Sequence, residues 1–384
     1  MSTTITPLHP AGAFPPGLRP PLAPAPAEQA GPGAGRRHAA LAVLSAFAAM
    51  LLLLALAFHG YVAWVIAHPY VPALTSNPLA AKGLAYDDVS FPSKSGRTTV
   101  HGWYIPAPAS GGGAASATLA AAGADAGPSA AKAAAIPASD RTVVFSHGYG
   151  ANREETWVPM YDLAKLLHGL HYNVFMFDYG YASSGVRTPA TGGLEESQQL
   201  LAAIQYARSQ GAGEVVVWGF SMGAGTALQA ALQTDASDRI DAMLLDSLFL
   251  PTGDSLYSNV QQYLKELPRY PSVPLIKWML PFFTGVHLDS LPVRQVLQTP
   301  YPMPVFIMHG TDDAIASVST AKRIAADQQN ALSRSWVVEG GKHELLFKTR
   351  PKEYIQRAAL FLSQVDAAYK TDQAAAADNA GQAA

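Results

Sequence analysis

A series of short apolar runs in the folded part of the chain restricts the fold more than any other feature. The runs cover residues 142–148, 173–180, 214–220, 242–247, 305–310 and 335–340. They are continuous rather than alternating, as strands covered on both faces require, and the segments between them are long enough for crossover helices. The sequence therefore predicts alternating strands and helices around a mostly parallel central sheet, with helices on both of its faces.

Two further segments refine this prediction. Residues 193–211 carry apolar side chains at near-helical spacing, acidic residues early, Arg208 late and Gly211 as a stop, which predicts a helix. Residues 86–106 contain two runs in which polar side chains alternate with apolar ones. That pattern is typical of a half-exposed antiparallel pair, so we expect a hairpin at the edge of the sheet.

The N-terminal part of the chain contains one long uncharged stretch, Leu41 to Ala67. It exceeds the about 20 residues that a helix needs to cross a bilayer, so we predict an uncleaved transmembrane anchor over 38–67. Arg36 and Arg37 precede it and no Lys or Arg follows closely, so the positive-inside rule places the N-terminus in the cytoplasm and the rest outside. A cleaved signal peptide and a buried soluble helix are the alternative interpretations.

Compositional bias divides the remainder of the chain. Segments rich in Pro, Ala and Gly cannot bury enough apolar surface to order themselves. We therefore expect a disordered cytoplasmic tail over 1–37, a folded domain over 83–366, a low-complexity insertion over 107–140, a small helical cap over 247–300 and a disordered tail over 367–384.

Charge and cysteine content exclude several functions. The net charge of -2 gives no electrostatic reason to expect a nucleic-acid partner. The chain has no cysteine, which excludes disulfides, thiolate metal sites, lipid anchors on cysteine and cysteine catalysis. We expect neither a metal nor an organic cofactor, because the side chains described next complete a reaction without one.

The stretch "EVVVWGFSMGAG", residues 214–225, places Ser221 between Gly219 and Gly223 where a strand becomes a helix. A serine nucleophile must stand clear of the sheet on a sharp turn, and side chains at the flanking positions would collide with that turn. The helix that follows directs its free N–H groups at a developing oxyanion, so the amide of Met222 is one predicted donor. The pattern alone is of modest specificity, but its position after β-forming residues favours a nucleophile.

A serine needs a base, and the base needs an acid that orients it. His343, in a glycine-rich loop after the last apolar run, is the predicted base; His287 and His309 are the other histidines that follow the serine. Of the two adjacent acids in "HGTDDAIA", we choose Asp313 and keep Asp312 in reserve. Asp246 is a weaker alternative acid.

The second oxyanion donor is expected in the loop after the run 142–148. The glycines of "HGYGAN" permit a close backbone approach, and the amide of Tyr149 is the predicted donor. His147 and His309 end strands before a glycine and are expected to shape turns.

Taken together, the motifs "GWYIPA", "FSHGYGAN", "FDYGYASSG", "GFSMGAG", "LLDSLF", "HGTDDAIA" and "GGKHELL" resemble the α/β-hydrolase fold. The resemblance runs from about Tyr86 to Val365 and is closest to a membrane-anchored branch that includes acylglycerol lipases, depalmitoylases and serine-aminopeptidase-like domains. It implies that Asp313 is the triad acid and Tyr149 the oxyanion residue. The family's usual "DYRGYGxSxG" appears as "DYGYASSG", and Ile315 and Ala316 replace its usual Val-Pro.

The function expected from these residues is a membrane-anchored serine hydrolase that cleaves carboxylic ester or thioester bonds of an apolar acyl substrate through an acyl-enzyme. The alternatives are a serine peptidase or aminopeptidase-like hydrolase, and a non-catalytic binding protein of the same fold. Apolar cap residues such as Tyr257, Trp278, Phe282 and Phe283 are candidates to line an acyl pocket. We expect a small-molecule or lipid substrate, a periplasmic domain on a bacterial inner membrane and no nucleic-acid partner; the oligomeric state is left open.

Overall fold

The computed structural model describes residues 32–107 and 138–383. The first part of the predicted tail over 1–37 and nearly all of the insertion over 107–140 lie outside these residues. The chain divides into two units, Met1–Ala55 and Leu56–Ala384.

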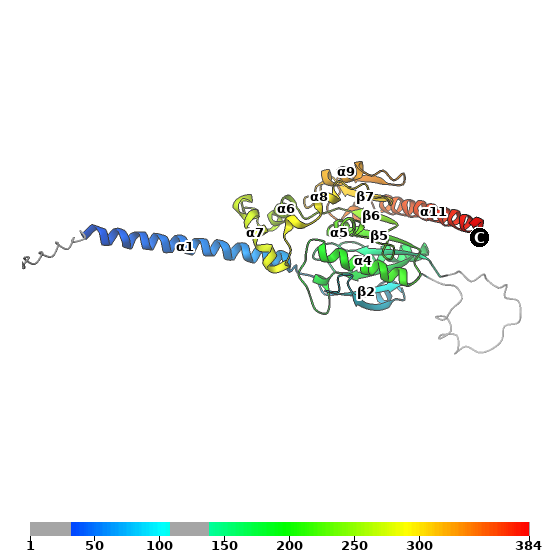
Figure 1. The fold of residues 1–384 in the computed structure, drawn as a ribbon, viewed down its shortest axis with the longest axis horizontal. Helices are drawn as coiled ribbons and strands as arrows, with labels where there is room; N and C mark the ends of the chain where they lie inside the picture. Colours follow the sequence, from blue (N-terminus) through cyan, green and yellow to red (C-terminus); the bar gives the residue numbers. More distant parts are fainter. Residues whose placement is uncertain (1–31, 108–137, 384) are drawn as a thin grey trace, which may run out of the picture. The chain divides into compact units, whose positions relative to one another are not determined.

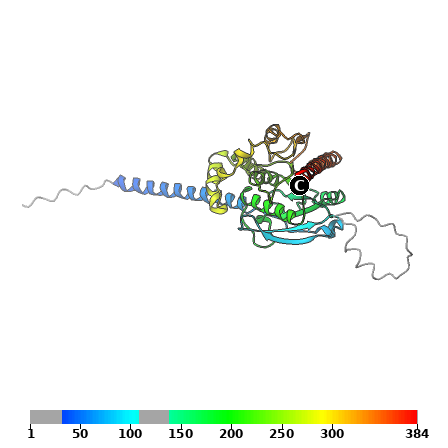
Figure 2. The ribbon, with the colours of Figure 1, turned by 45° about the vertical axis from the view of Figure 1, so that its right-hand side comes forward.

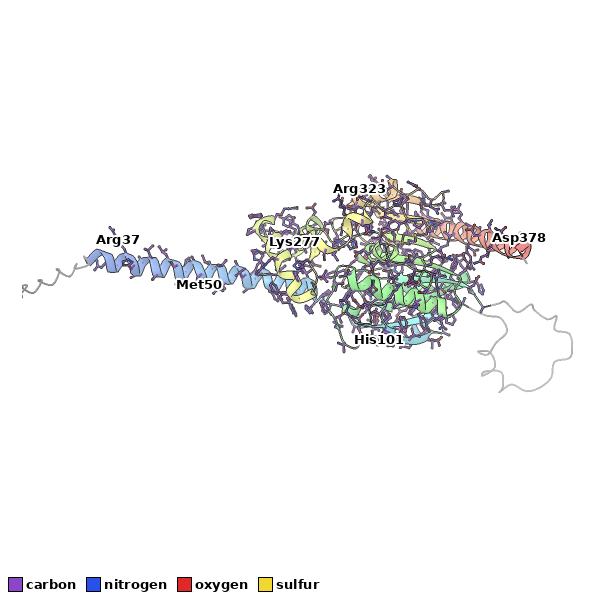
Figure 3. The ribbon with its side chains drawn as sticks, in the orientation of Figure 1. Arg37, Met50, His101, Lys277, Arg323 and Asp378 are labelled. Atoms are coloured by element: carbon purple, nitrogen blue, oxygen red, sulfur yellow. The ribbon has the colours of Figure 1, made fainter. Side chains whose placement is uncertain are left out.

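The described part of the first unit is helical. It belongs to α1 (Pro32–Ala67), whose first six residues fall within the predicted disordered tail over 1–37. Met50 and its neighbours are exposed along this helix (Figure 3). Gly35–Ala67 is the one helix among the described residues that is long and apolar enough to cross a membrane.

The second unit is built on a central sheet of eight strands, ordered β1-β2-β4-β3-β5-β6-β7-β8 (Figure 1). The strands are β1 (Asp87–Pro92), β2 (Thr99–Ile105), β3 (Arg141–Ser146), β4 (Asn173–Asp178), β5 (Glu214–Phe220), β6 (Ala242–Asp246), β7 (Val305–Gly310) and β8 (Arg334–Val338). The β1–β2 hairpin is antiparallel and lies at the edge of the sheet, and all pairs from β4 to β8 are parallel. The predicted parallel sheet and edge hairpin are confirmed.

Helices cover both faces of this sheet, as Figures 1 and 2 show. Along β5, Val215 and Val217 face a core shared with α4 (Leu194–Ser209), α5 (Met222–Ala231), α8 (Val293–Val296) and α9 (Val318–Ala326). Val216 and Trp218 face the opposite core, formed with α3 (Met160–Gly169), α10 (Leu346–Thr349) and α11 (Pro351–Ala383). Because successive side chains of a strand point to opposite faces, double cover explains why the apolar runs are continuous.

A small helical cap lies between β6 and β7, where it was predicted. It consists of α6 (Gly253–Tyr263) and α7 (Arg269–Thr284), and Lys277 is labelled on it in Figure 3. Val62 and Ala63, from the last turns of α1, share an apolar cluster with Ile276, Met279 and Leu280 of α7. These last turns of α1 belong to the same unit as the cap. A short helix, α2 (Pro78–Lys82), follows them.

The C-terminal segment differs from the predicted disordered tail over 367–384. The structure continues α11 from Pro351 to Ala383. The segment is rich in alanine, which has the highest helix propensity, and Lys370 pairs with Asp366 one turn earlier at 2.9 Å. Low sequence complexity was therefore a poor guide to structure here.

Candidate active site

The turn at Ser221 is a sharp junction between a buried strand and a helix. Ser221 has φ 49° and ψ -117°, a strained conformation for a residue with a side chain. A Cβ added at Gly219 would lie 2.6 Å from the Cα of Ala224, and one added at Gly223 would collide with the carbonyl oxygen of Ser146. The glycines are therefore required by close backbone contacts, which bring the start of α5 against the end of β3.

The structure brings Ser221, His343 and Asp313 together from three distant parts of the chain. The Oγ atom of Ser221 lies 2.7 Å from His343 Nε2, and His343 Nδ1 lies 2.7 Å from Asp313 Oδ2. The second oxygen of Asp313 accepts the backbone N–H groups of Ile315 and Ala316 at 2.9 and 2.8 Å. These bonds fix the carboxylate, and the carboxylate fixes the imidazole ring.

The charge of Asp313 favours the tautomer of His343 that carries its proton on Nδ1. Burial opposes ionisation of Asp313, yet hydrogen bonds from His309 and His343 hold the pKa of this carboxyl well below its usual range. The ionised carboxylate must receive a proton from His343 Nδ1, which leaves Nε2 free to accept the hydroxyl proton of Ser221. Burial lowers the pKa of His343, but the bond to Asp313 and nearby negative charges outweigh it, so the net pKa is raised.

The two other candidate acids have different surroundings. Asp312 is exposed and accepts the hydroxyl of Thr311 at 3.0 Å. Asp246 is buried and accepts hydroxyl groups from Tyr354 and Ser247, each at 2.8 Å. Burial raises the pKa of Asp246 to about 6, and these two hydrogen bonds oppose the rise. Neither carboxylate bonds to His343.

The other candidate histidines have structural contacts. His147 Nε2 accepts the N–H of Tyr179 at 3.1 Å, so its Nδ1 donates to the carbonyl oxygen of Gly148 at 2.9 Å. Burial lowers the pKa of His147 to about 4, which keeps this neutral tautomer. His309 Nε2 lies 3.1 Å from the carbonyl oxygen of Ala316 and 3.2 Å from Asp313 Oδ2.

The peptide between Gly148 and Tyr149 is held in one orientation. Its carbonyl oxygen accepts the hydroxyl of Tyr181 at 2.9 Å as well as the His147 ring. Because a trans peptide is planar, fixing the carbonyl also fixes the Tyr149 N–H, which points the opposite way. Within the described ranges, neither the Tyr149 nor the Met222 N–H donates to a protein acceptor. Both amides are therefore available to a ligand.

Sequence reasoning missed a pair of buried glutamates beside this site, Glu155 and Glu344. Glu155 Oε1 accepts the N–H of Gly148 at 2.8 Å, and Glu344 Oε2 accepts Trp157 Nε1–H at 2.6 Å. Glu344 directly follows His343, which is the one signal in the sequence that could have drawn attention to it. Nothing in the spacing of Glu155 indicates that it contacts Glu344.

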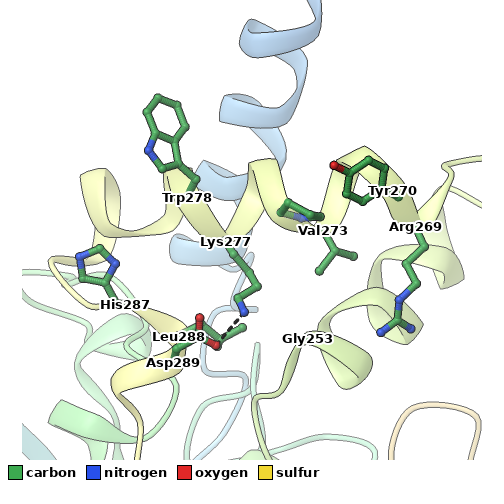
Figure 4. A pocket seen from close by; sticks show the side chains of 10 residues that line it. Gly253, Arg269, Tyr270, Val273, Lys277, Trp278, His287, Leu288 and Asp289 are labelled. Carbon is green, nitrogen blue, oxygen red and sulfur yellow. Dashed lines mark hydrogen bonds and ion pairs between the residues drawn. The ribbon is translucent and has the colours of Figure 1, made fainter.

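The cap contains a cavity of about 560 Å³, shown in Figure 4. Its walls include Arg269, Tyr270, Lys277, Trp278 and His287, but none of the triad side chains. Trp278 lines this cavity although 60 % of its surface is exposed, whereas Phe282, which is 72 % exposed, is not among the lining residues. Lys277 pairs with Asp289 across the cavity at 2.7 Å. Among the described residues, no group of three or more acidic, histidine or cysteine side chains is arranged to hold a metal ion.

Solved structures share this fold. An esterase of Pyrococcus furiosus, Pf2001, superposes with a TM-score of 0.56 at 20% sequence identity, covering 77% of this chain and 98% of that one. At that identity the likeness concerns the fold.

Two curated relatives are similar to this chain over more than half of its length. A protein of Salmonella typhimurium, the uncharacterized protein YfhR, is 23% identical over 71% of this chain and 82% of its own length. Its counterpart in Escherichia coli O157:H7 is 25% identical over 60% of this chain, and the match spans only 63% of that protein's length.

A family comparison covers the parallel part of the sheet from within β3 to β8, together with the nucleophile turn and the histidine loop, in one stretch. The model of the alpha/beta hydrolase family matches residues 143–357, more than half of the 384 residues. The matched region includes Ser221, Asp313 and His343. The chain therefore belongs to the alpha/beta hydrolase family.

Proposed function

We propose that this protein is a membrane-anchored serine hydrolase that cleaves carboxylic ester or thioester bonds of apolar acyl substrates. The hydrogen-bonded series Ser221–His343–Asp313 carries this proposal, with both of its links at 2.7 Å. The Pyrococcus furiosus protein of similar fold is named an esterase, which agrees with an ester substrate.

The geometry supports a two-step acyl transfer. His343 Nε2 takes the hydroxyl proton as Ser221 Oγ attacks the carbonyl carbon of the substrate, and Asp313 stabilises the imidazolium that forms. The Tyr149 and Met222 N–H groups donate to the oxyanion of the tetrahedral intermediate. His343 then gives its proton to the departing alcohol or thiol, which leaves an acyl group on Ser221. A water molecule, deprotonated by His343, attacks this ester and releases the acid.

Membrane attachment is proposed from the apolar helix α1. Its residues before Leu56 are exposed, whereas the turns that contain Val62 and Ala63 are packed against α7. We therefore assign the bilayer-crossing part to the turns that precede this contact, where about 20 apolar residues are available. Tyr61, Trp64 and Trp278 are exposed near this contact. Tyrosine and tryptophan are enriched at membrane surfaces, where an apolar ring meets a polar edge.

The catalytic part of the proposal is tested with a fluorophosphonate probe and with p-nitrophenyl esters of increasing chain length, on the full chain in detergent. We expect labelling of the wild type and none of Ser221→Ala, and a fall in kcat of roughly 10³-fold or more in His343→Ala and Asp313→Asn. Asp312→Asn is the matched control and should stay close to wild type. A folded wild type that neither labels nor hydrolyses any ester would refute the catalytic function.

The anchor is tested separately in bacterial membranes. We expect the full chain to resist carbonate extraction, and an alkaline-phosphatase reporter fused after Ala67 to be active, because Arg36 and Arg37 hold the N-terminus in the cytoplasm. An inactive reporter on a stable fusion would reverse the orientation. Release of the full chain by carbonate would remove the anchor from the proposal.

A further inference from the structure

Glu155 and Glu344 lie together behind the active site, and both are almost fully buried, with 1 and 7 % of their surface exposed. A Cβ added at Gly148 would collide with Glu344 Oε1 and lie 2.6 Å from Glu155 Oε1. The two carboxyl groups therefore meet at the Cα of Gly148. They come from different segments, since Glu155 follows β3 and Glu344 follows the catalytic histidine.

Each carboxyl group has one oxygen with a donor and one without. Glu155 Oε1 accepts from Gly148 and Glu344 Oε2 from Trp157, whereas Glu155 Oε2 and Glu344 Oε1 have no N–H or hydroxyl donor among the described residues. Two ionised carboxylates in contact at a buried position repel strongly, and each would leave an oxygen unsatisfied. One proton shared in the hydrogen bond between the two carboxyl groups removes the repulsion between them.

The surroundings of the two carboxyl groups favour protonation of Glu155. Burial and the neighbouring Glu344 raise the pKa of Glu155 well above its ordinary value. Burial also raises the pKa of Glu344, but His343 and the hydrogen bonds from Glu155 and Trp157 oppose that rise. A Glu155 hydroxyl that donates to a Glu344 carboxylate satisfies every donor and acceptor described above.

The backbone around the pair is strained and held in place. Glu155 and Glu344 have φ values of 37° and 56°, which residues with side chains rarely adopt. Ser247, with φ 53°, accepts the N–H of Glu344 at 2.9 Å and donates to Asp246. Such strain persists only where surrounding contacts over-determine it, and it often occurs at functional sites.

We propose that Glu155 and Glu344 share one proton as a carboxylic acid–carboxylate pair that positions the Gly148–Tyr149 peptide against the loop carrying His343. The pair connects the proposed oxyanion donor to the base, because Glu155 binds the Gly148 N–H and Glu344 is bonded to His343. Glu344 also places a fixed negative charge beside the imidazolium that forms during catalysis. Both glutamates act through other groups and do not touch the substrate.

The titratable groups around the pair come from every neighbouring element. They are His343, Asp313, Asp246, Tyr354, Tyr179 and Tyr181. Asp246 and Asp313 are acids with partners of their own, and burial keeps the three tyrosines neutral by raising the pKa of each. As the pH rises past the raised pKa of Glu155, the pair therefore loses its shared proton and carries two charges.

The kinetic part of the test rests on the proposed hydrolase function. Glu155→Gln keeps the shape, an acceptor for Gly148 and a donor for Glu344, but cannot ionise. We expect its kcat at pH 7 to stay within about threefold of wild type, and Glu155→Leu to lose roughly 30-fold or more. We expect the kcat/KM of the wild type to fall reversibly once the pH is high enough to ionise the pair, and this fall should be absent from Glu155→Gln. Glu344→Gln should move the acid limb of kcat/KM to lower pH, because a negative charge beside His343 is removed.

A second readout does not need activity. The melting temperature of the wild type should fall relative to that of Glu155→Gln as the pH rises, because the raised pKa of Glu155 means that the folded chain holds a proton that the unfolded chain has released. Glu214→Gln is the control for the kinetic readout alone, because Glu214 is a buried carboxyl at the end of β5 opposite Ser221 and its replacement should leave the pH profile of kcat/KM unchanged. Equal losses in Glu155→Gln and Glu155→Leu, or melting curves with the same pH dependence in wild type and Glu155→Gln, would overturn the shared proton. An inactive wild type with the expected melting behaviour would refute the hydrolase and leave the pair standing.

Discussion

The hydroxyl of Tyr149 donates a hydrogen bond to the carbonyl oxygen of Ile66 at 2.7 Å. Ile66 lies in the last turn of α1, and the backbone N–H of Tyr149 is the proposed oxyanion donor. The residues that follow Ile66 are held in a similar way. The N–H of Ala190 donates to the carbonyl oxygen of Ala67 at 2.7 Å, and the side-chain amide of Asn152 donates to the carbonyl oxygen of Pro72 at 2.9 Å. The end of the proposed membrane anchor is therefore bonded directly to the loop that would stabilise the transition state.

Tyr149→Phe tests this connection. The change removes the bond to Ile66 but keeps the ring and the backbone amide, so we expect kcat to fall roughly threefold to tenfold, the loss of about one hydrogen bond, with KM little changed. Steady-state hydrolysis of a p-nitrophenyl ester measures it. Tyr263→Phe, on an exposed side chain of α6, is the control. An unchanged kcat in Tyr149→Phe would mean that α1 does not support the oxyanion loop.

The pH dependence of kcat/KM should reflect the raised pKa of His343. The base must be neutral to accept the proton of Ser221, and the bond to Asp313 and the charge of Glu344 favour its protonated form. Activity is therefore lost as the pH falls through a value above the ordinary 6.5 of histidine. Asp313→Asn removes one of these charges, so its residual activity should show an acid limb at lower pH. A wild-type limb below 6.5 would contradict this assignment.

Glu214 should make the folded state less stable as the pH rises. Burial and the charge of Asp366 raise its pKa to about 8, against 4.5 in the unfolded chain. Between these values the unfolded chain has released a proton that the folded chain retains, so the free energy of unfolding falls with increasing pH. Glu214→Gln cannot ionise, so it should be more stable than wild type at pH 8 by on the order of a few kcal/mol.

The difference between Glu214→Gln and wild type should shrink toward pH 4, where both side chains are neutral. Urea unfolding of both proteins at pH 4, 6 and 8 measures it. A stability difference that is the same at every pH would show that packing, and not ionisation, distinguishes the two side chains.

Gly223→Ala should disrupt the nucleophile turn. The added methyl group would collide with the carbonyl oxygens of Ser146 and His147, which are backbone atoms and cannot rotate away. We expect a loss of about 2 kcal/mol or more in the free energy of unfolding, and much slower fluorophosphonate labelling of Ser221. Gly169→Ala is the matched control, because a Cβ there meets nothing within 4 Å. Equal stability of the two variants would show that the turn tolerates a side chain.

Local sequence patterns were sufficient to predict the strands of the sheet and the turn that carries Ser221. Continuous apolar runs predicted the parallel strands, because a strand buried on both faces needs apolar side chains at every position. The glycines around Ser221 predicted the sharp turn. Asp313 was chosen with Asp312 in reserve, and the resemblance to known motifs implied the same residue. In the structure Asp313 is the acid that contacts His343, and Asp312 accepts the hydroxyl of Thr311.

The sequence by itself determined which side chains could react and which segments form strands, because both depend on residue types and short-range spacing. Only the tertiary structure decided that Glu155 meets Glu344, that α1 ends against the Tyr149 loop and that α11 extends to Ala383. Trp157 and Glu344 are separated by 187 positions in the sequence, and nevertheless Trp157 Nε1 lies 2.6 Å from Glu344 Oε2. Contacts of this kind depend on how the strands are ordered in the sheet, and no periodicity along the chain records that order.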